Sequence, residues 1–120
     1  MAQDFKVNGM QRSIMIIDDE VDECILLANH LRKKGFQVDF AHTLSEGIDI
    51  LRLPDHLLLD NHLPDGPGWQ YASLIRGLFP QLAITLITSG ETEEKQRPED
   101  KFRRLTKPLS FADLDLMLGT

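Results

Sequence analysis

Long apolar runs are missing from this sequence of 120 residues. Runs such as Ile14–Ile17 and Leu57–Leu59 are far shorter than the roughly 20 residues that a helix needs to cross a bilayer. The opening stretch, residues 1–12, lacks the apolar segment of a secretory signal. A single cysteine, Cys24, excludes an internal disulfide. We therefore expect no membrane span and a cytoplasmic location.

Positive charge is also scarce, since 13 Lys and Arg face 19 Asp and Glu and give a net charge of −6. Nucleic-acid binding without sequence preference needs a basic surface, so we expect none here. The sequence has no His/Cys set with zinc spacing, no glycine-rich phosphate loop and no Gly-x-Ser-x-Gly elbow. Conventional zinc-enzyme, nucleotidase and serine-hydrolase functions are therefore disfavoured. Carboxylates gathered around a cation suit the composition better.

The length and composition that are present suit one folded domain. A chain of 120 residues lies in the commonest size range for a single core. Its 42% apolar and 27% charged residues are ordinary for a globular protein and argue against wholesale disorder. We predict a flexible N-terminal extension over residues 1–12 and one domain over residues 13–120.

Short apolar stretches alternate with helical patterns along the chain. Strands are predicted at residues 13–17, 36–40, 56–59, 82–87 and 104–106. Helices are predicted at residues 21–33, 44–51, 69–78 and 111–118. This alternation favours parallel pairing through right-handed crossovers. The predicted fold class is α/β: a doubly wound five-stranded parallel sheet flanked by helices.

Chemically active side chains follow four of these strands. Asp18 and Asp19 follow the first, Asp60 the third, Thr88 the fourth and Lys107 the fifth. In a doubly wound sheet, ligands bind beyond the carboxyl ends of the strands. We therefore expect these five residues to share one site.

Clustered carboxylates repel one another unless a pKa rises or a hard cation such as Mg²⁺ is present. Asp19, Asp60 and a backbone carbonyl just after Asp60 are candidate direct ligands, and Asp18 is a candidate to hold a coordinated water. Positive charge and donors around a phosphoryl group promote its transfer, and Lys107 and Thr88 provide them. Asp60 is the candidate nucleophile, because a carboxylate can accept a phosphoryl group.

Five ordered motifs resemble the response-regulator receiver family of two-component signalling, the CheY-like domains, across residues 13–118. They are Ile16–Glu20, Leu57–Asp60, Leu63–Gly66, Thr88–Gly90 and Leu105–Pro108. The resemblance implies a flavodoxin-like fold and a regulatory domain that is not an enzyme in its own right. It also implies a phosphoryl donor, either a histidine kinase or a histidine phosphotransfer protein, and an output domain or protein partner.

The resemblance also assigns roles to single residues. It implies that Asp60 is the phosphoacceptor and that Thr88 and Lys107 contact the phosphoryl group. Asp18, Asp19, Asp60 and the His62 carbonyl would form the Mg²⁺ site. A cis peptide between Lys107 and Pro108 is expected as well, and proline makes that isomer accessible.

The sequence departs from the family between its fourth and fifth strands. Residues 91–101 are highly charged, contain Pro98 and have no apolar anchor. We expect the family's fourth helix to be short, displaced or disordered here, and this segment to be mobile. Arg104 stands where many relatives have an aromatic switch residue, so a ring flip cannot operate.

Two functions from different classes stay open: a phosphorylation-operated switch and a phosphorylation-independent interaction module. The intact set of five site residues favours the switch. A phosphatase like those of the haloacid dehalogenase family is excluded, because such enzymes have an aspartate where this chain has His62. An EF-hand is excluded because His62 and Pro64 occupy positions that need oxygen ligands. Whether the chain is a stand-alone receiver or part of a larger protein stays open.

The remaining histidines and the cysteine are interpreted as structural. His30, His42 and His56 show no evident partners in the sequence, and Cys24 is expected to be a small buried residue on its helix. Trp69 is expected to pack at the start of a helix.

Overall fold

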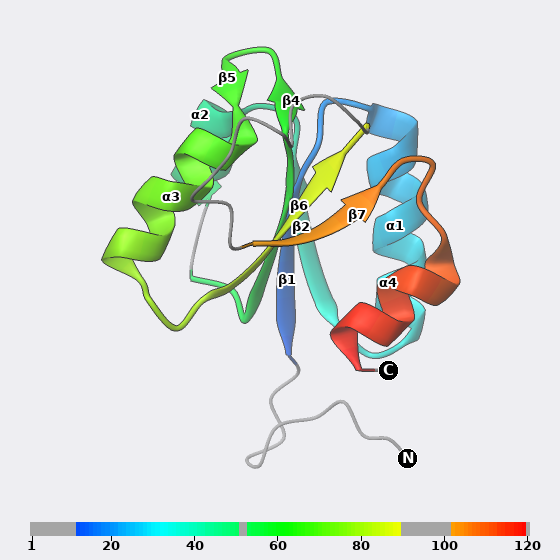
Figure 1. Ribbon diagram of the computed structural model, residues 1–120. Coiled ribbons are helices and arrows are strands. Elements are labelled where there is room, and N and C mark those ends of the chain that lie inside the picture. The colour runs from blue at the N-terminus through cyan, green and yellow to red at the C-terminus, as the bar shows by residue number, and fades with distance from the viewer. Residues whose placement is uncertain (1–11, 51–52, 90–101, 120) are drawn as a thin grey trace.

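The computed structural model describes residues 12–50, 53–89 and 102–119. Five strands alternate with helices, and a small hairpin follows the third strand (Figure 1). In chain order the elements are β1 (Ser13–Ile17), α1 (Val21–Lys33), β2 (Gln37–Ala41), α2 (Leu44–Ile50), β3 (His56–Asp60), β4 (His62–Leu63), β5 (Gly66–Pro67), α3 (Gly68–Leu78), β6 (Ala83–Thr88), β7 (Arg103–Thr106) and α4 (Phe111–Leu118).

The main sheet has five parallel strands in the order β2-β1-β3-β6-β7. This is the strand order of flavodoxin-like doubly wound folds. The predicted fold class is therefore confirmed. The central strands β1 and β3 are buried on both faces, as their nearly continuous apolar sequences predict. Strand β2 lies at one edge, as its alternating sequence indicates.

Helices cover both faces of the sheet, and each pair encloses its own core (Figure 1). Helices α1 and α4 pack on one face over Ile16, Leu58 and Ile87. Helices α2 and α3 cover the other face over Leu57 and Leu59. Successive residues of a strand point to opposite faces, so Leu57, Leu58 and Leu59 supply both cores and hold β3 firmly at the centre.

The helices lie where the sequence predicted them, but not every apolar residue on them is buried. On α1 the buried side chains include Leu27, whereas Val21 and Ile25 are exposed. On α3 the buried residues are Gly68, Ala72 and Ile75, and Leu78 is 73% exposed. Apolar residues occur on more than one side of both helices, so periodicity alone did not determine which side meets the sheet.

Side-chain caps and a glycine mark the ends of three helices. The Thr43 hydroxyl accepts a hydrogen bond from the Glu46 N–H at 3.1 Å, and the Ser110 hydroxyl accepts one from Asp113 at 3.2 Å. Gly35 follows α1 with a φ of 100°, the left-handed conformation expected of a residue that ends a helix. The local sequence therefore determines where these helices begin and end.

Two predictions fall outside the described residues. The proposed flexible extension, residues 1–12, lies there except for Arg12, and so does the charged segment at residues 91–101 that was expected to replace the fourth helix. In the part of the chain that the structure describes, no helix has the length and apolar character needed to cross a membrane.

The three histidines that seemed to lack partners all have them, so that interpretation is corrected. His30 Nε2 lies 2.8 Å from Asp115 and its ring stacks on Phe111. His42 Nδ1 lies 3.0 Å from the Asp18 carbonyl. Each contact joins segments that are distant in sequence, which is why the sequence did not reveal it.

His56 is buried at the amino end of β3, where its Nε2 lies 2.9 Å from the Thr85 hydroxyl. That hydroxyl donates to Met117 Sδ, so His56 donates to Thr85. Burial, reinforced by Arg103 and Arg12, lowers the pKa of His56 to about 4. The folded protein therefore holds this imidazole neutral under conditions where an unfolded chain would protonate it.

We expect this histidine to destabilise the fold in mild acid. An unfolded histidine titrates near pH 6.5, so above that pH His56 is neutral in both states and does not lower the free energy of unfolding. As the pH drops toward 4, only the unfolded chain binds the proton, and the free energy of unfolding falls. The loss approaches roughly 3 kcal/mol of the free energy of unfolding. Urea denaturation at several pH values should show this slope in wild type and its loss in His56→Gln. The exposed His62→Gln should keep it, and an unchanged slope in His56→Gln would refute the assignment.

Candidate functional site

Three aspartates meet at the carboxyl ends of β1 and β3, as the sequence predicted. One carboxylate oxygen from each of Asp18, Asp19 and Asp60 lies within 4.8 Å of the others. Asp18 and Asp60 are buried, with exposed fractions of 0% and 2%, whereas Asp19 is exposed. Because β1 and β3 are parallel neighbours, their ends bring these residues together.

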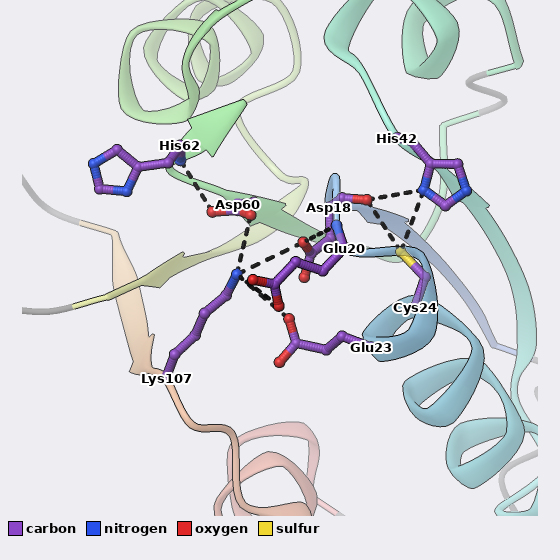
Figure 2. Close-up of polar contacts among 8 residues, drawn as sticks. All are labelled: Asp18, Glu20, Glu23, Cys24, His42, Asp60, His62 and Lys107. Carbon is purple, nitrogen blue, oxygen red and sulfur yellow. Dashed lines mark hydrogen bonds and ion pairs between the residues drawn. The ribbon is translucent and has the colours of Figure 1, made fainter. Parts of the chain in front are cut away.

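Backbone contacts fix the position of Asp18. Its N–H donates to the Ala41 carbonyl at 3.0 Å, and its own carbonyl accepts from Cys24 Sγ at 3.2 Å and His42 Nδ1 at 3.0 Å (Figure 2). One carboxylate oxygen accepts from the Glu20 N–H at 3.0 Å. The buried Cys24 thus supports the junction of β1 and α1, and burial raises the pKa of its thiol to about 12.

The loop after β3 orients Asp60. Its Oδ1 accepts a hydrogen bond from the His62 N–H at 3.0 Å (Figure 2). Asn61 next to it is buried, and its side-chain oxygen accepts from the Trp69 N–H at 2.8 Å, which ties the loop to the start of α3. A Cβ on Gly68 would lie 2.3 Å from the Asp60 carbonyl oxygen, so only glycine permits this close approach of backbone to backbone.

The hairpin formed by β4 and β5 is held beside the site by Asp65. One Asp65 oxygen accepts from the Leu44 N–H at 3.0 Å and the other from Ser45 at 3.1 Å. These bonds satisfy the free N–H groups at the start of α2 and lower the pKa of Asp65. The predicted turn between Leu63 and Gly68 therefore also caps a helix.

Lys107 reaches the aspartates from the end of β7. Its backbone N–H donates to the Thr88 carbonyl at 2.7 Å, and its peptide bond to Pro108 is cis, as expected. The Nζ atom lies 3.2 Å from Asp60 Oδ2 and 3.7 Å from Asp18 Oδ1 (Figure 2). The structure thus brings together the acids and the lysine that the sequence assigned to one site.

Two further acids were missed by the sequence analysis. Glu20 and Glu23 lie 3.5 Å and 3.4 Å from Lys107 Nζ. Their spacing of three residues places them on one side of the turn that begins α1, and that spacing was the available signal. One ammonium group therefore faces four carboxyl groups.

This crowding shifts the pKa values in opposite directions. Burial raises the pKa of Asp60 to about 7, and the charge of Asp18 acts in the same sense. Burial and the neighbouring Asp18 raise the pKa of Glu23 to about 8. Burial also opposes ionisation of Asp18, but hydrogen bonds with Glu23 and Glu20 outweigh it and keep the pKa of Asp18 below its usual value. The site holds more negative charge than Lys107 neutralises.

Lys107 stays charged in this setting. Burial favours its neutral form, but the charges of Asp60, Asp18 and Glu23 outweigh that effect and raise its pKa. A permanent ammonium beside Asp60 supplies positive charge where a transferred anionic group would need it.

The donor set fits a hard divalent cation. Asp18 Oδ2 is buried and accepts no hydrogen bond from a donor in the described residues. Together with the oxygens of Asp19 and Asp60, it forms the all-oxygen environment that Mg²⁺ prefers. Burial, together with the charge of Asp18, raises the pKa of Asp60, and such a cation would favour its ionised form.

A hollow of about 430 Å³ opens onto these groups. It is lined by Asp19, Glu20, Asp60, His62, Ser89 and Lys107. Thr88 is buried at the end of β6 and is not among the lining residues, although the Ser89 that follows it is. The other predicted site residues therefore face one space or directly support it.

A family model matches most of the chain. Residues 14–118 match the model described as the response regulator receiver domain. The chain belongs to the response-regulator receiver family. It is a receiver domain of two-component response regulators, and receiver domains are regulatory domains.

Curated proteins and solved structures agree with this assignment. The receiver domain is 32% identical over 88 residues to the photosynthetic apparatus regulatory protein RegA of Rhodobacter capsulatus, covering 72% of this chain and 48% of RegA. It is 35% identical over 89 residues to the acid tolerance regulatory protein ActR of Rhizobium meliloti, covering 72% of this chain and 46% of ActR. The chain thus spans about half the length of these curated relatives.

The HemR receiver domain of Leptospira biflexa has the same fold. The TM-score is 0.80 at 24% identity, with 91% of this chain and 92% of that chain covered. TrrA of Thermotoga maritima, solved in complex with Mg²⁺ and BeF, gives a TM-score of 0.78 at 22% identity, with coverage of 91% and 97%. At these identities the likeness shows the fold.

We expect Lys107→Met to destabilise the receiver domain in metal-free buffer at pH 8. It would leave Asp60 and Asp18 buried without their cation, a change that costs about 2–3 kcal/mol of the free energy of unfolding. Chemical denaturation measures the loss. Lys33→Met, at an exposed position near the end of α1, removes the same charge and should have little effect. Equal stabilities of the two variants would contradict the role assigned to Lys107.

Proposed function

We propose that this receiver domain accepts a phosphoryl group on Asp60 and thereby switches its interactions with an output domain or protein partner. The donor is a phosphohistidine of a histidine kinase or a histidine phosphotransfer protein. The observation that carries the proposal is the pairing of the buried Asp60 carboxylate with Lys107 Nζ, 3.2 Å apart, in a cluster of three aspartates. Surface ion pairs do not need this arrangement, whereas phosphoryl transfer does.

Asp60 is the nucleophile in this proposal. An Asp60 oxygen attacks phosphorus while the phosphorus–nitrogen bond of the donor breaks, and the bonding electrons go to the imidazole, which takes up a proton. The His62 N–H fixes the carboxylate from one side, at 3.0 Å from Oδ1. Lys107 neutralises charge that develops on the phosphoryl oxygens. The Thr88 hydroxyl at the end of β6 is proposed as a further donor to the same group.

Asp18, Asp19, Asp60 and the His62 carbonyl are the proposed ligands of Mg²⁺. The three carboxylates fit the ion because their oxygens lie within 4.8 Å of one another and Asp18 Oδ2 lacks a hydrogen-bond donor among the described residues. When bound, Mg²⁺ supplies positive charge to the equatorial phosphoryl oxygens. The complex of TrrA with Mg²⁺ and BeF supports the choice of ion.

The proposed switch acts through the β6 end of the site. Ser89 lines the hollow, and Thr88 is joined to Lys107 through the backbone. A phosphoryl group held by Thr88 and Lys107 would draw the ends of β6 and β7 together and move the loop that begins at Ser89. Because Arg104 occupies the aromatic switch position, partner recognition would depend on this loop and on charge.

The cellular location follows from the proposed phosphoryl donors. Histidine kinases and phosphotransfer proteins provide phosphohistidine inside the cell, and the buried, reduced Cys24 is compatible with a reducing compartment. We therefore propose a cytoplasmic location. The acidic composition argues against direct binding of this domain to nucleic acid.

The switch can be tested by amide NMR spectra recorded with Mg²⁺ before and after addition of phosphoramidate. We expect phosphorylation to shift the signals of His62, Ser89 and Lys107 most strongly, because these residues line the hollow. Wild type that stays unmodified with small donors and with phosphorylated kinase would exclude the switch and favour a phosphorylation-independent interaction module.

A further inference from the structure

A second hollow lies at the opposite end of the sheet from the aspartates. It has a volume of about 580 Å³ and is lined by Arg12, His56, Arg76, Ala83, Ile84, Arg103, Leu116, Met117, Leu118 and Gly119. His56, Ala83 and Arg103 are the first residues of β3, β6 and β7, so this hollow sits at the amino ends of three parallel strands. In Figure 1 this is the end of the sheet where α4 finishes.

Among the described residues that line it, three are arginines and none is acidic. This is unusual in a chain with a net charge of −6, in which 19 acidic residues outnumber 13 basic ones. The field at this position is correspondingly positive: besides burial, the charges of Arg103 and Arg12 help to lower the pKa of His56. An anion would find positive charge here that no acidic side chain among the described lining residues offsets.

The guanidinium groups are held in place by packing. Arg76 lies over the Phe102 ring, 4.8 Å from its centroid, and Arg12 lies over Phe36 at 5.1 Å. Such stacking holds the planar group while leaving its N–H edges available. The hollow is therefore partly organised before any ligand arrives.

Within the described residues, hydrogen bonds account for only part of these donors. Arg103 donates to the Met117 carbonyl at 3.2 Å and Arg12 to the Leu118 carbonyl at 3.5 Å, which uses one N–H of the five on each guanidinium. Arg76 Nε is buried and has no hydrogen-bond partner among the described residues. A buried charged donor without a partner is costly, and an anion held in the hollow that Arg76 lines would offset the charge of its guanidinium.

We propose that this hollow is a binding site for the phosphate groups of a small polyphosphate ligand, either inorganic pyrophosphate or a nucleoside diphosphate. A carboxylate has two oxygens, which one guanidinium satisfies, whereas linked phosphates present enough oxygens for three guanidiniums. The volume lies in the range of small-molecule sites. Apolar side chains on the same walls, including Ile84 and Leu116, would contact the non-phosphate part of a nucleotide.

The proposal is independent of phosphorylation at Asp60. The two hollows have no described lining residue in common, and they lie at opposite ends of β3, which begins at His56 and ends at Asp60. Failure of one function would leave the other untouched.

Calorimetric titration in Mg²⁺-free buffer with chelator tests the proposal, with pyrophosphate, ADP and citrate as probes. We expect wild type to bind pyrophosphate or ADP more tightly than citrate, and Arg76→Gln to lose roughly tenfold or more in affinity. Arg103→Gln should weaken binding as well. Lys33→Gln removes an exposed charge elsewhere, and Asp60→Asn alters the other hollow. Both should bind the phosphates at least as well as wild type.

The three probes separate the possible ligands. Tighter binding of ADP than of pyrophosphate would support a nucleotide that uses the apolar walls, and equal affinities would support the inorganic ion. Citrate binding as tightly as both phosphates would overturn the choice of phosphate. Absence of binding by wild type at millimolar probe, or unchanged affinity in a folded Arg76→Gln variant, would overturn the site itself.

Discussion

Wild type incubated with acetyl phosphate and Mg²⁺ is expected to gain the mass of one phosphoryl group, and Asp60→Asn is expected to gain none. The amide of asparagine is a poor nucleophile, and no second carboxylate of the cluster has the same surroundings. Asp60 alone combines burial, a 3.0 Å hydrogen bond from His62 and the 3.2 Å contact with Lys107. Intact-mass spectrometry measures the change directly.

Asp39→Asn is the matched control, because Asp39 is exposed on the edge strand β2 and is neither in the aspartate cluster nor among the described residues that line the hollow. It should be phosphorylated like wild type. Full phosphorylation of Asp60→Asn, or its loss in Asp39→Asn, would contradict the assignment of the acceptor. A folded Lys107→Met variant should react more slowly than wild type, because its phosphoryl oxygens would lack the ammonium group.

The same Asp60→Asn substitution should raise the stability of the metal-free receiver domain. Burial raises the pKa of Asp60 to about 7, so at pH 8 the folded state bears the cost of a buried charge that the unfolded chain does not. Removing that charge should add roughly 2 kcal/mol to the free energy of unfolding. The folded state binds the proton more tightly, so the advantage should be largest above pH 7 and shrink as the pH falls toward 4.

Mg²⁺ should make wild type more stable than Asp60→Asn. A ligand that binds only the folded state stabilises it, by about 2.7 kcal/mol when its free concentration is about 100 times Kd. Wild type should show this gain, and Asp60→Asn and Asp19→Asn should lose most of it. Urea denaturation with chelator and with Mg²⁺ measures both effects, and Asp39→Asn should behave like wild type. A less stable Asp60→Asn in chelator, or an undiminished Mg²⁺ effect in both site variants, would contradict this account of the carboxylate cluster.

The sequence was sufficient to predict the fold and the gathering of the site residues. Continuous apolar strands predicted a sheet buried on both faces, and their polar ends predicted where Asp18 and Asp60 would meet. The prediction succeeded because parallel strands with right-handed crossovers place their carboxyl ends at one edge. Lys107 could be assigned to the same edge because it follows β7 directly.

Contacts that depend on side-chain direction could not be predicted in the same way. Glu23 approaches Lys107 because the start of α1 turns toward the site, and this depends on how the helix is rotated on the sheet. That rotation cannot be read from the sequence, since Val21 and Ile25 are apolar like the buried residues of α1 but are exposed. The choice of buried face is made by packing against strands distant in sequence.

Histidine partners were missed for a related reason. His30 pairs with Asp115, which is 85 residues away, and His56 pairs with Thr85 on the neighbouring strand β6. Such pairs are set by strand register and helix docking, which local sequence patterns do not contain. The cluster of Arg12, Arg76 and Arg103 has the same origin, because each residue comes from a different part of the chain.

Chemical trapping of the phosphorylated residue tests the central claim most directly. Borohydride reduces an acyl phosphate on an aspartate side chain to a primary alcohol, which converts that aspartate into homoserine. After treatment with acetyl phosphate, Mg²⁺ and borohydride, peptide mass spectrometry should locate homoserine at position 60 and at no other aspartate. Homoserine at position 18 or 19 instead, or none in a chain that has gained phosphate, would contradict Asp60 as the phosphoacceptor.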